Sequence, residues 1–369
     1  MEREYQICKR CLMDSTDPDN VFDSDGICKY CKNALKRLNE IYFVDPAIKK
    51  ERLNQLVNKI KKDGKNKKYD CIIGLSGGTD SSYLAYYIVK ELNLRPLAVH
   101  IDNGWNTELA IKNIDNLVNK LDIDLFTYVI DWEEFRDLQL AYLKASVIDI
   151  EVLSDNPIFV VISRVAKRHH AKYFLGGMNI ASESIMPSTW LFPYKSDPLN
   201  IRSIYKKFGS GRKLKTYPIF SVFEYLLHRK ILRTYNILDF INYNKIDAVE
   251  KLRNEFEWRE YGGKHHESFI TKFYQTYILP NKFNVDKRKA HLSSLILSNQ
   301  IKRDEALAEI QKPLFTSNLE LENSISYFIK KIGITRDDLE MIMHKSPVSH
   351  YDYKTFVNPI KKIASIIKR

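Results

Sequence analysis

At residues 71–81 the chain reads Cys71-Ile-Ile-Gly-Leu-Ser-Gly-Gly-Thr-Asp-Ser81, an apolar run that leads directly into a glycine-rich turn. Residues 82–90 follow with apolar side chains at helical spacing, so the predicted order is strand, loop and helix. Gly77 and Gly78 can adopt backbone angles closed to other residues, and the start of the helix adds the positive end of a dipole. The stretch therefore predicts a loop whose backbone N–H groups hold a phosphate group.

The polar side chains of this loop indicate what else the site holds. Ser76 and Ser81 add hydroxyl donors, whereas the charge of Asp80 repels phosphate unless a metal ion or an N–H group at the start of the helix neutralises it. We therefore expect Mg²⁺ next to Asp80. The alternative is an ordinary surface turn between a strand and a helix.

The six residues from Ser76 to Ser81 resemble the PP-loop of the ATP pyrophosphatases, in which Ser-Gly-Gly-x-Asp-Ser binds the pyrophosphate end of ATP. Enzymes of this superfamily transfer AMP to an oxygen of the substrate. The resemblance implies that the loop binds ATP and that Ser76 and Asp80 take part in catalysis. The loop residues expected to contact ATP are Ser76, Gly77, Gly78, Thr79, Asp80 and Ser81.

Three more apolar runs, at residues 96–101, 125–130 and 171–175, look like buried strands and alternate with helical stretches. This alternation predicts an α/β fold with a doubly wound parallel sheet. Ligands bind such sheets at the carboxyl ends of the strands, where polar residues and glycines follow each run here. The residues expected on that edge are Asp102, Asn103, Asp131, Gly176 and Asn179. For each polar one, a role in an ordinary turn is an equal alternative.

Four cysteines near the start of the chain form two Cys-x-x-Cys pairs, Cys8 with Cys11 and Cys28 with Cys31, separated by residues 12–27. This spacing predicts a structural zinc ribbon with four thiolate ligands, which leaves no position for a catalytic water. Disulfides are the alternative. The chain has no secretory signal and no apolar stretch of about 18 residues, so we expect a cytoplasmic protein without membrane insertion, where disulfides are disfavoured.

A chain of 369 residues with 44% hydrophobic content can bury a substantial core, and we expect four regions. These are a zinc-ribbon module at 1–40, a helical linker at 41–66, a PP-loop domain at 67–219 and a helical substrate or partner region at 220–369. The net charge of +12 calls for an anionic partner or substrate. A basic cluster at 202–215 could bind nucleic-acid phosphate or a nucleotide-sugar diphosphate, and charge alone does not choose between them.

Three further stretches carry a closer resemblance: 176–190, which reads Gly176-Gly-Met-Asn-Ile-Ala-Ser-Glu-Ser-Ile-Met-Pro-Ser-Thr-Trp190, and the stretches 262–269 and 286–291. With the cysteine pairs and the PP-loop they resemble the N-acetyl sugar amidotransferases of surface-polysaccharide and nonulosonic-acid pathways. Ser184 stands where that family would have glycine.

The resemblance implies an ATP-dependent exchange of oxygen for ammonia on the acetamido group of a nucleotide-linked N-acetyl sugar. The products would be an acetamidino sugar, AMP and pyrophosphate, in the biosynthesis of O-antigen lipopolysaccharide or of flagellin glycans. It also implies that a separate glutaminase and a barrel-type synthase subunit supply the ammonia. Cys71 is badly placed to be a glutaminase nucleophile because it lies on a core strand beneath the loop.

An amide oxygen is a poor leaving group, but transfer of AMP to it creates an imidate from which AMP departs easily. Glu183 is the candidate for orienting the acetamido N–H or for accepting a proton from ammonia, and a loop carboxylate paired with arginine is the alternative. His265 and His266 could act only from a loop, because neighbours on a helix face different directions. The cations expected to clamp phosphate are Lys264, Lys287 and Arg288.

Two other classes of function stay open. A transfer-RNA-modifying enzyme of the thiolase or lysidine type would share the adenylating loop, the cysteine pairs and the basic charge. A thiolase would need two more cysteines, and only Cys71 is left. A nucleotide-binding protein without activity would have no need of Ser76, Asp80 and Ser81. We therefore expect a nucleotide-sugar substrate and no nucleic acid.

Overall fold

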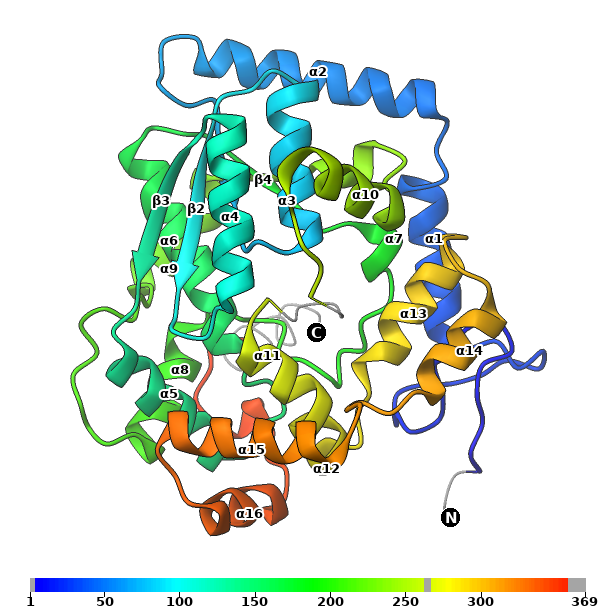
Figure 1. Cartoon of the computed structure of the whole chain (residues 1–369), viewed down its shortest axis with the longest axis vertical. Helices are drawn as coiled ribbons and strands as arrows, with labels where there is room; N and C mark the ends of the chain where they lie inside the picture. The colour runs from blue at the N-terminus through cyan, green and yellow to red at the C-terminus, as the bar shows by residue number, and fades with distance from the viewer. Residues whose placement is uncertain (1–3, 262–266, 358–369) are drawn as a thin grey trace, which may run out of the picture.

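A five-stranded parallel sheet forms the centre of the computed structural model, which describes residues 4–261 and 267–357, with only the backbone for 228–231 (Figure 1). The strand order is β3-β2-β1-β4-β5, and every neighbouring pair is parallel. The strands are β1 (Cys71–Gly74), β2 (Pro96–Asp102), β3 (Asp124–Val129), β4 (Tyr173–Gly176) and β5 (Arg233–Asn236). The chain builds the sheet outward from β1 in one direction and then from β4 in the other, so the switch point lies between β1 and β4.

This topology confirms the predicted α/β fold with a doubly wound parallel sheet. Four strands lie where the apolar runs predicted them. The fifth, β5, was not predicted, because Arg233-Thr-Tyr-Asn236 is short and polar and follows a helix. It pairs with β4 as an edge strand.

Side chains alternate between two helical layers, as the two-residue period of a strand requires. Cys71 and Ile73 of β1 pack in the core formed with α3 (Thr79–Tyr86), α4 (Glu108–Leu121) and α10 (Lys245–Phe256). Ile72 points to the other face, where it packs against α6 (Val152–Arg168). Figure 1 shows α3, α4 and α10 in front of the sheet and α6 behind it.

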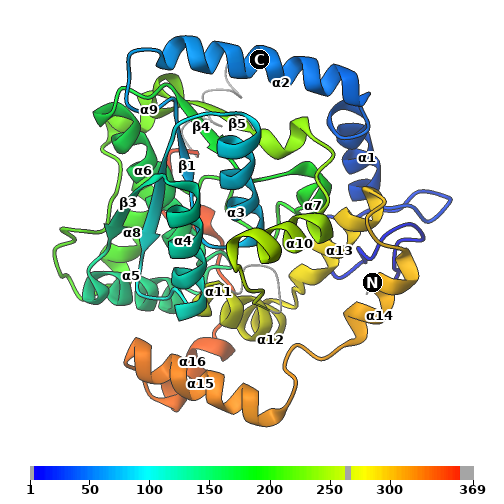
Figure 2. The same ribbon diagram turned by 45° about the horizontal axis from the view of Figure 1, so that its top comes forward.

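The remaining helices surround the sheet (Figures 1 and 2). α2 (Pro46–Gly64) crosses the amino edge of the strands, and α11, α12, α15 and α16 gather below the carboxyl edge. Their bounds and those of the other helices are α1 (Lys29–Ile41), α5 (Trp132–Ala145), α7 (Ile180–Glu183), α8 (Pro198–Phe208), α9 (Val222–Ile231), α11 (Phe269–Phe273), α12 (Leu279–Phe283), α13 (Lys287–Leu297), α14 (Arg303–Gln311), α15 (Asn318–Ile332) and α16 (Arg336–His344).

The expected domain boundaries at residues 40, 66 and 219 stay a prediction. In the structure α2 shares its core with the sheet, and the segment after 219 supplies β5 as well as helices. Within the described residues, no helix has both the length and the apolar character needed to cross a bilayer.

His350 is a buried histidine in the last described segment of the chain. Its ring stacks on Phe192 with centroids 4.5 Å apart, and Nδ1 lies 3.0 Å from Oδ1 of Asn200. Nε2 is buried without a hydrogen-bond partner among the described residues. Burial lowers the pKa of His350 to about 4, so the folded protein holds this ring neutral.

His350 should therefore make stability fall as the pH drops from 6.5 towards 4. In that window the unfolded chain takes up a proton that the folded protein cannot, which removes roughly 3 kcal/mol of unfolding free energy. Urea unfolding at several pH values measures this effect, with His350→Gln as the variant that cannot titrate. If the variant loses stability over this window as steeply as the original protein, the assignment is wrong.

Candidate functional site

The glycine-rich loop joins the carboxyl end of β1 to the start of α3. Gly77 has φ +83°, and a Cβ at this position would lie 2.7 Å from the carbonyl oxygen of Ala110, so only glycine fits. Gly78 is the N-cap of α3, and no side chain caps the helix. The first N–H groups of α3 are therefore available to an anion, as the sequence predicted.

Two serine hydroxyls flank these N–H groups. The Oγ atoms of Ser76 and Ser81 lie 3.1 Å apart, and Ser81 Oγ accepts a hydrogen bond from the Ser76 N–H over 3.3 Å. Gly78 N–H donates to Ser76 Oγ over 3.3 Å. Thr79 is the first residue of α3. The structure thus brings all six predicted loop residues into one compact turn.

Two aromatic side chains hold the loop from behind. The carbonyl oxygen of Gly77 accepts hydrogen bonds from Trp258 Nε1 over 2.9 Å and from the Tyr261 hydroxyl over 2.6 Å. Asn113 Nδ2 in turn donates to the Tyr261 hydroxyl over 2.8 Å. These anchors fix the unusual backbone of Gly77 before any ligand arrives. Sequence reasoning missed this role, because the anchors come from a segment about 180 residues further along the chain.

Asp80 lies in the first turn of α3 and accepts a hydrogen bond from the hydroxyl of Tyr243. Burial and the Asp80 carboxylate hold the pKa of Tyr243 well above its usual value, and the Glu183 carboxylate raises it further. The Asp80 carboxylate therefore lies against the Tyr243 hydroxyl, and the charge of Glu183 acts on the same hydroxyl.

The chain that leaves β4 lies directly beside the loop. A Cβ on Gly177 would lie 3.1 Å from the carbonyl oxygen of Asp80, so the residue after Gly176 must be small. Asn179 caps α7, with Oδ1 accepting the Ser182 N–H over 2.9 Å. Its Nδ2 is buried and has no partner among the described residues, which leaves one amide donor next to the site. Glu183 ends α7.

Asp102 and Asn103 lie at the end of β2 and stabilise the turn that follows. Asp102 Oδ1 accepts the Gly104 N–H over 2.9 Å, and Asn103 Oδ1 accepts the Trp105 N–H over 3.1 Å. These are the ordinary turn contacts that the sequence left open as an alternative. Asp131 acts in the same way as the N-cap of α5. Contact of Asp102 or Asn103 with ATP stays a prediction.

The turn after β2 carries a segment that sequence reasoning did not connect with the loop. The Thr107 N–H donates to the carbonyl oxygen of Glu267 over 3.0 Å, and the Phe269 N–H donates to that of Trp105 over 3.0 Å. This pairing places the Glu267 carboxylate against the loop, where its Oε1 lies 3.4 Å from Ser76 Oγ. Lys264, His265 and His266, which precede it, lie outside the described residues.

Asp80 and Glu267 give the loop two carboxylates, and the serines add hydroxyl oxygens. Mg²⁺ prefers such oxygen ligands and usually also takes phosphate oxygens of the substrate. The chemistry of these side chains therefore fits the Mg²⁺ that the sequence predicted next to Asp80, and binding of Mg²⁺ stays a prediction. A carboxylate beside a phosphate site is otherwise unfavourable because of charge repulsion.

A group of largely half-buried charges gathers at the start of α6. The C-terminus of α6 leads into the amino end of β4, so its N-terminus lies at the carboxyl edge of the sheet, the same edge as the loop. Lys195 Nζ lies 2.6 Å from Asp149 and 3.1 Å from Asp155. Burial would raise the pKa of Glu151, but Lys287 and Lys195 lower it to about 2.

The two predicted phosphate-clamping cations of α13 are both engaged. Lys287 pairs with Glu151, at the edge of the sheet that holds the loop. All three guanidinium nitrogens of Arg288 donate to Asp286 or to carbonyl oxygens at the end of α14. Binding of phosphate by Lys287 or Arg288 stays a prediction. To bind phosphate, either side chain would have to leave the partners named above.

The four cysteines near the N-terminus form a single buried cluster. Their Sγ atoms all lie within 4.8 Å of one another, with Cys8 and Cys31 3.6 Å apart and Cys11 and Cys28 3.7 Å apart. Ligands on a tetrahedron with Zn–S bonds of about 2.3 Å would be about 3.8 Å apart, and a disulfide needs about 2.05 Å. Four backbone N–H groups also point at these sulfurs. The cluster therefore fits the predicted structural zinc.

Two family models match parts of the chain. Residues 267–366 match the model described as LPS biosynthesis protein WbpG-like, C-terminal domain, and residues 48–144 match the NAD synthase model. The two regions meet at the site, since the loop lies in the second and Glu267 begins the first.

The chain is also similar to parts of two curated proteins. An uncharacterized protein of Methanocaldococcus jannaschii is 28% identical over 132 residues, which is 35% of this chain and 45% of that protein. A tRNA(Ile)-lysidine synthase of Chlamydia pneumoniae is 36% identical over 71 residues, which is 19% of this chain and 22% of that protein. The match spans less than half of either relative. Among solved structures, NMN synthetase from Francisella tularensis aligns over 59% of this chain and 95% of its own, with TM-score 0.30 and 14% identity.

Proposed function

Because the chain belongs to the WbpG-like proteins of the PP-loop ATP pyrophosphatase superfamily, we propose that it is an ATP-dependent amidotransferase acting on a nucleotide-linked N-acetyl sugar. It would convert the acetamido group into an acetamidino group in the biosynthesis of a surface polysaccharide such as O-antigen. The observation that carries the proposal is the glycine-rich loop with Asp80 and Glu267 beside it and with Glu183 at the end of α7, which follows β4.

The proposed reaction has two steps. The acetamido oxygen attacks the α-phosphorus of ATP, the bond between the α- and β-phosphates breaks, and pyrophosphate leaves. Ammonia then adds to the imidate carbon, loses a proton, and AMP departs with the oxygen. The N–H groups of the loop and the hydroxyls of Ser76 and Ser81 would stabilise the charge that grows on the departing pyrophosphate. Bound magnesium would neutralise part of that charge.

Glu183 is the proposed general base. It ends α7, whose N-cap Asn179 has a buried amide donor that could hold the acetamido group. A carboxylate in this position could take the proton that ammonia loses as it adds to the carbon. Glu183 follows β4 in the chain, and β4 borders the switch point of the sheet, where ligands bind in this fold.

The ammonia would come from another protein. Cys71 is fully buried on β1, and burial, with a contribution from Asp70, raises the pKa of its thiol. A buried thiol with a raised pKa cannot serve as a glutaminase nucleophile. A glutaminase and a barrel-type synthase subunit are therefore the proposed partners.

A transfer-RNA-modifying enzyme is the second candidate. The similarity to a tRNA(Ile)-lysidine synthase favours it, but that match covers 22% of the relative. The region that matches the WbpG-like model contains Glu267, whose carboxylate contacts the glycine-rich loop. This part of the chain therefore forms part of the site.

Pyrophosphate release from ATP tests the proposal. Purified protein with ammonium chloride would be assayed with UDP- and CMP-linked N-acetyl sugars and with bulk transfer RNA. We expect release that depends on one nucleotide sugar and on ammonia, and mass spectrometry should show N–H in place of oxygen. Ser76→Ala serves as the control for the loop. Release that needs transfer RNA instead would reject the sugar substrate.

A further inference from the structure

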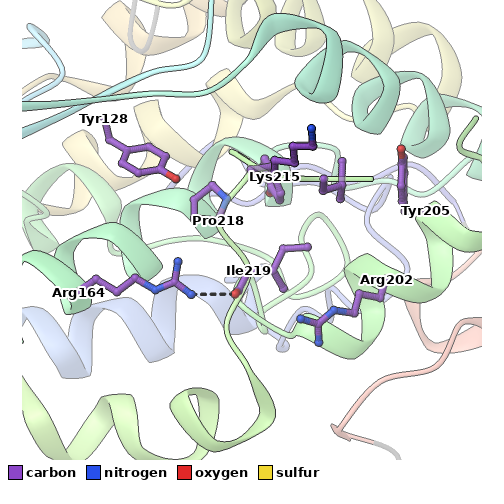
Figure 3. Close-up of a pocket in the computed structure, with 9 residues that line it drawn as sticks. Tyr128, Arg164, Arg202, Tyr205, Lys215, Pro218 and Ile219 are labelled. Carbon is purple, nitrogen blue, oxygen red and sulfur yellow. Dashed lines mark hydrogen bonds between the residues drawn. The ribbon is translucent and has the colours of Figure 1, made fainter. Parts of the chain in front are cut away.

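A groove of about 430 Å³ lies near the carboxyl end of β3 (Figure 3), and none of the residues that line it belongs to the glycine-rich loop. Tyr128 of β3 lines it, with Arg164 of α6 and with Arg202 and Tyr205 of α8. The rest of its wall comes from the end of the basic cluster noted in the sequence and from the residues just after it, namely Leu214, Lys215, Tyr217, Pro218 and Ile219. Its volume is within the range of pockets that bind small organic ligands.

The lining of this groove is positively charged. Arg164, Arg202 and Lys215 all contribute to it, and none of its lining residues is acidic. Arg164 forms an ion pair with Glu224, over 3.1 Å. Arg202 donates to the carbonyl oxygen of Phe220 over 3.3 Å. In the part of the chain that the structure describes, neither Arg202 nor Lys215 forms an ion pair with a carboxylate.

The groove is also rigid, because the buried carboxylate of Glu134 holds its wall. Glu134 accepts the N–H groups of Lys215, Thr216 and Tyr217 over 2.8, 2.8 and 2.9 Å. Arg164 Nη2 donates to the carbonyl oxygen of Ile219 over 3.1 Å, the contact drawn in Figure 3. A wall fixed in this way loses little conformational freedom when a ligand binds.

The wall connects the groove with the group of charges at the start of α6. The Tyr217 hydroxyl donates to the carbonyl oxygen of Leu153 over 3.1 Å, and Asn156 Nδ2 donates to the same hydroxyl over 3.2 Å. Both partners lie in the first two turns of α6. Glu151, the N-cap of α6, pairs with Lys287, so the groove and the charges flank one helix end at the edge that holds the loop.

We propose that this groove binds an organic diphosphate, with the two phosphates at Arg202 and Lys215 and the attached ring against Tyr128 and Tyr205. Guanidinium and ammonium groups recognise phosphate oxygens, and tyrosine rings offer a flat surface to a base or sugar. This assignment rests on the proposed function, in which the substrate is a nucleotide-linked sugar, and it requires a carrier with two phosphates, such as UDP, and not CMP. The acetamido end would then extend along the edge of the sheet towards the loop.

Calorimetric titration with UDP tests this assignment. UDP should bind the full-length protein, and Arg202→Gln or Lys215→Gln should each weaken it by about tenfold, because each removes a charged donor to phosphate. Lys206→Gln removes an exposed lysine of α8 that does not line the groove, and it should bind UDP like the original protein. A non-hydrolysable ATP analogue should not displace UDP, because it occupies the loop.

Four results would overturn the assignment. The first two are no UDP binding and the same affinity for UDP in all variants. The other two are displacement of UDP by the ATP analogue, and loss of transfer-RNA binding instead of UDP binding in the Arg202→Gln and Lys215→Gln variants. The proposed function can fail separately. If UDP binding depends on Arg202 and Lys215 but no nucleotide sugar supports pyrophosphate release, the groove is a diphosphate site and the sugar reaction is wrong.

Discussion

Asp80→Asn is expected to reduce pyrophosphate release by about a hundredfold or more, while the protein stays folded. Asparagine has the same size and can still accept the hydrogen bond from the Tyr243 hydroxyl, so the first turn of α3 should keep its position. The variant removes the negative charge that makes a magnesium ion next to ATP favourable. Steady-state pyrophosphate assays at saturating ATP and at several magnesium concentrations measure the effect.

Tyr243→Phe is the matched control. It keeps the buried ring and removes only the hydroxyl that orients the Asp80 carboxylate. Partners that orient a metal ligand typically contribute about 10–100-fold in activity or metal affinity, so a smaller loss than in Asp80→Asn is expected. Melting curves of both variants should stay close to that of the original protein. Full activity in Asp80→Asn would show that this carboxylate has no part in the reaction.

The fold could be predicted from the sequence wherever local patterns are strong. The apolar run at 71–75, the glycines at 77 and 78 and the helix that follows define β1, the loop and α3 without any distant contact. β5 could not be predicted, because its place is decided by pairing with β4 and not by its own polar residues. Strand order also depends on contacts between distant segments. The sequence indicates parallel strands, but the switch between β1 and β4 becomes visible only in the assembled sheet.

The candidate site likewise contains some residues that could be predicted from the sequence and others that could not. Ser76, Asp80 and Asn179 stand next to strands that the sequence identifies, so their common edge could be predicted. Glu267 reaches the loop through backbone pairing with the turn after β2, 160 residues earlier. Nothing in the local sequence indicates that pairing. The half-buried ion pair between Lys287 and Glu151 joins residues 136 positions apart, so the sequence indicates Lys287 as a cation but not its partner.

The N-terminal cysteine cluster is packed against the helices that border the site. The Leu12 N–H donates to Ser293 Oγ over 3.0 Å, and Arg303 donates to the carbonyl oxygen of Cys8 over 3.0 Å. Asp14 pairs with Lys289 at 2.5 Å. These contacts attach the cluster to α13 and α14. Through the contact of His291 with the carbonyl oxygen of Ser182, over 3.2 Å, α13 in turn supports α7 and Glu183.

Removing zinc from the cluster is therefore expected to lower the melting temperature by at least about 10 °C, because binding of structural zinc contributes about 10 kcal/mol or more to folding in small zinc modules. Pyrophosphate release should fall as well, since α13 loses its support. Metal analysis before and after treatment with a strong chelator, followed by melting curves and the pyrophosphate assay, measures both effects. Cys11→Ser should behave like the chelated protein.

Cys71→Ala is the control, because it removes a buried cysteine that lies outside the cluster. It should keep one zinc ion per chain, although it leaves a small cavity in the core. A protein that contains no zinc and melts at the same temperature with and without chelator would contradict the assignment. If chelation lowers the melting temperature but pyrophosphate release at low temperature is unchanged, the cluster stabilises the fold without supporting α7. The inference that the cluster supports Glu183 through α13 would then be wrong, and the assignment of the zinc site would be unaffected.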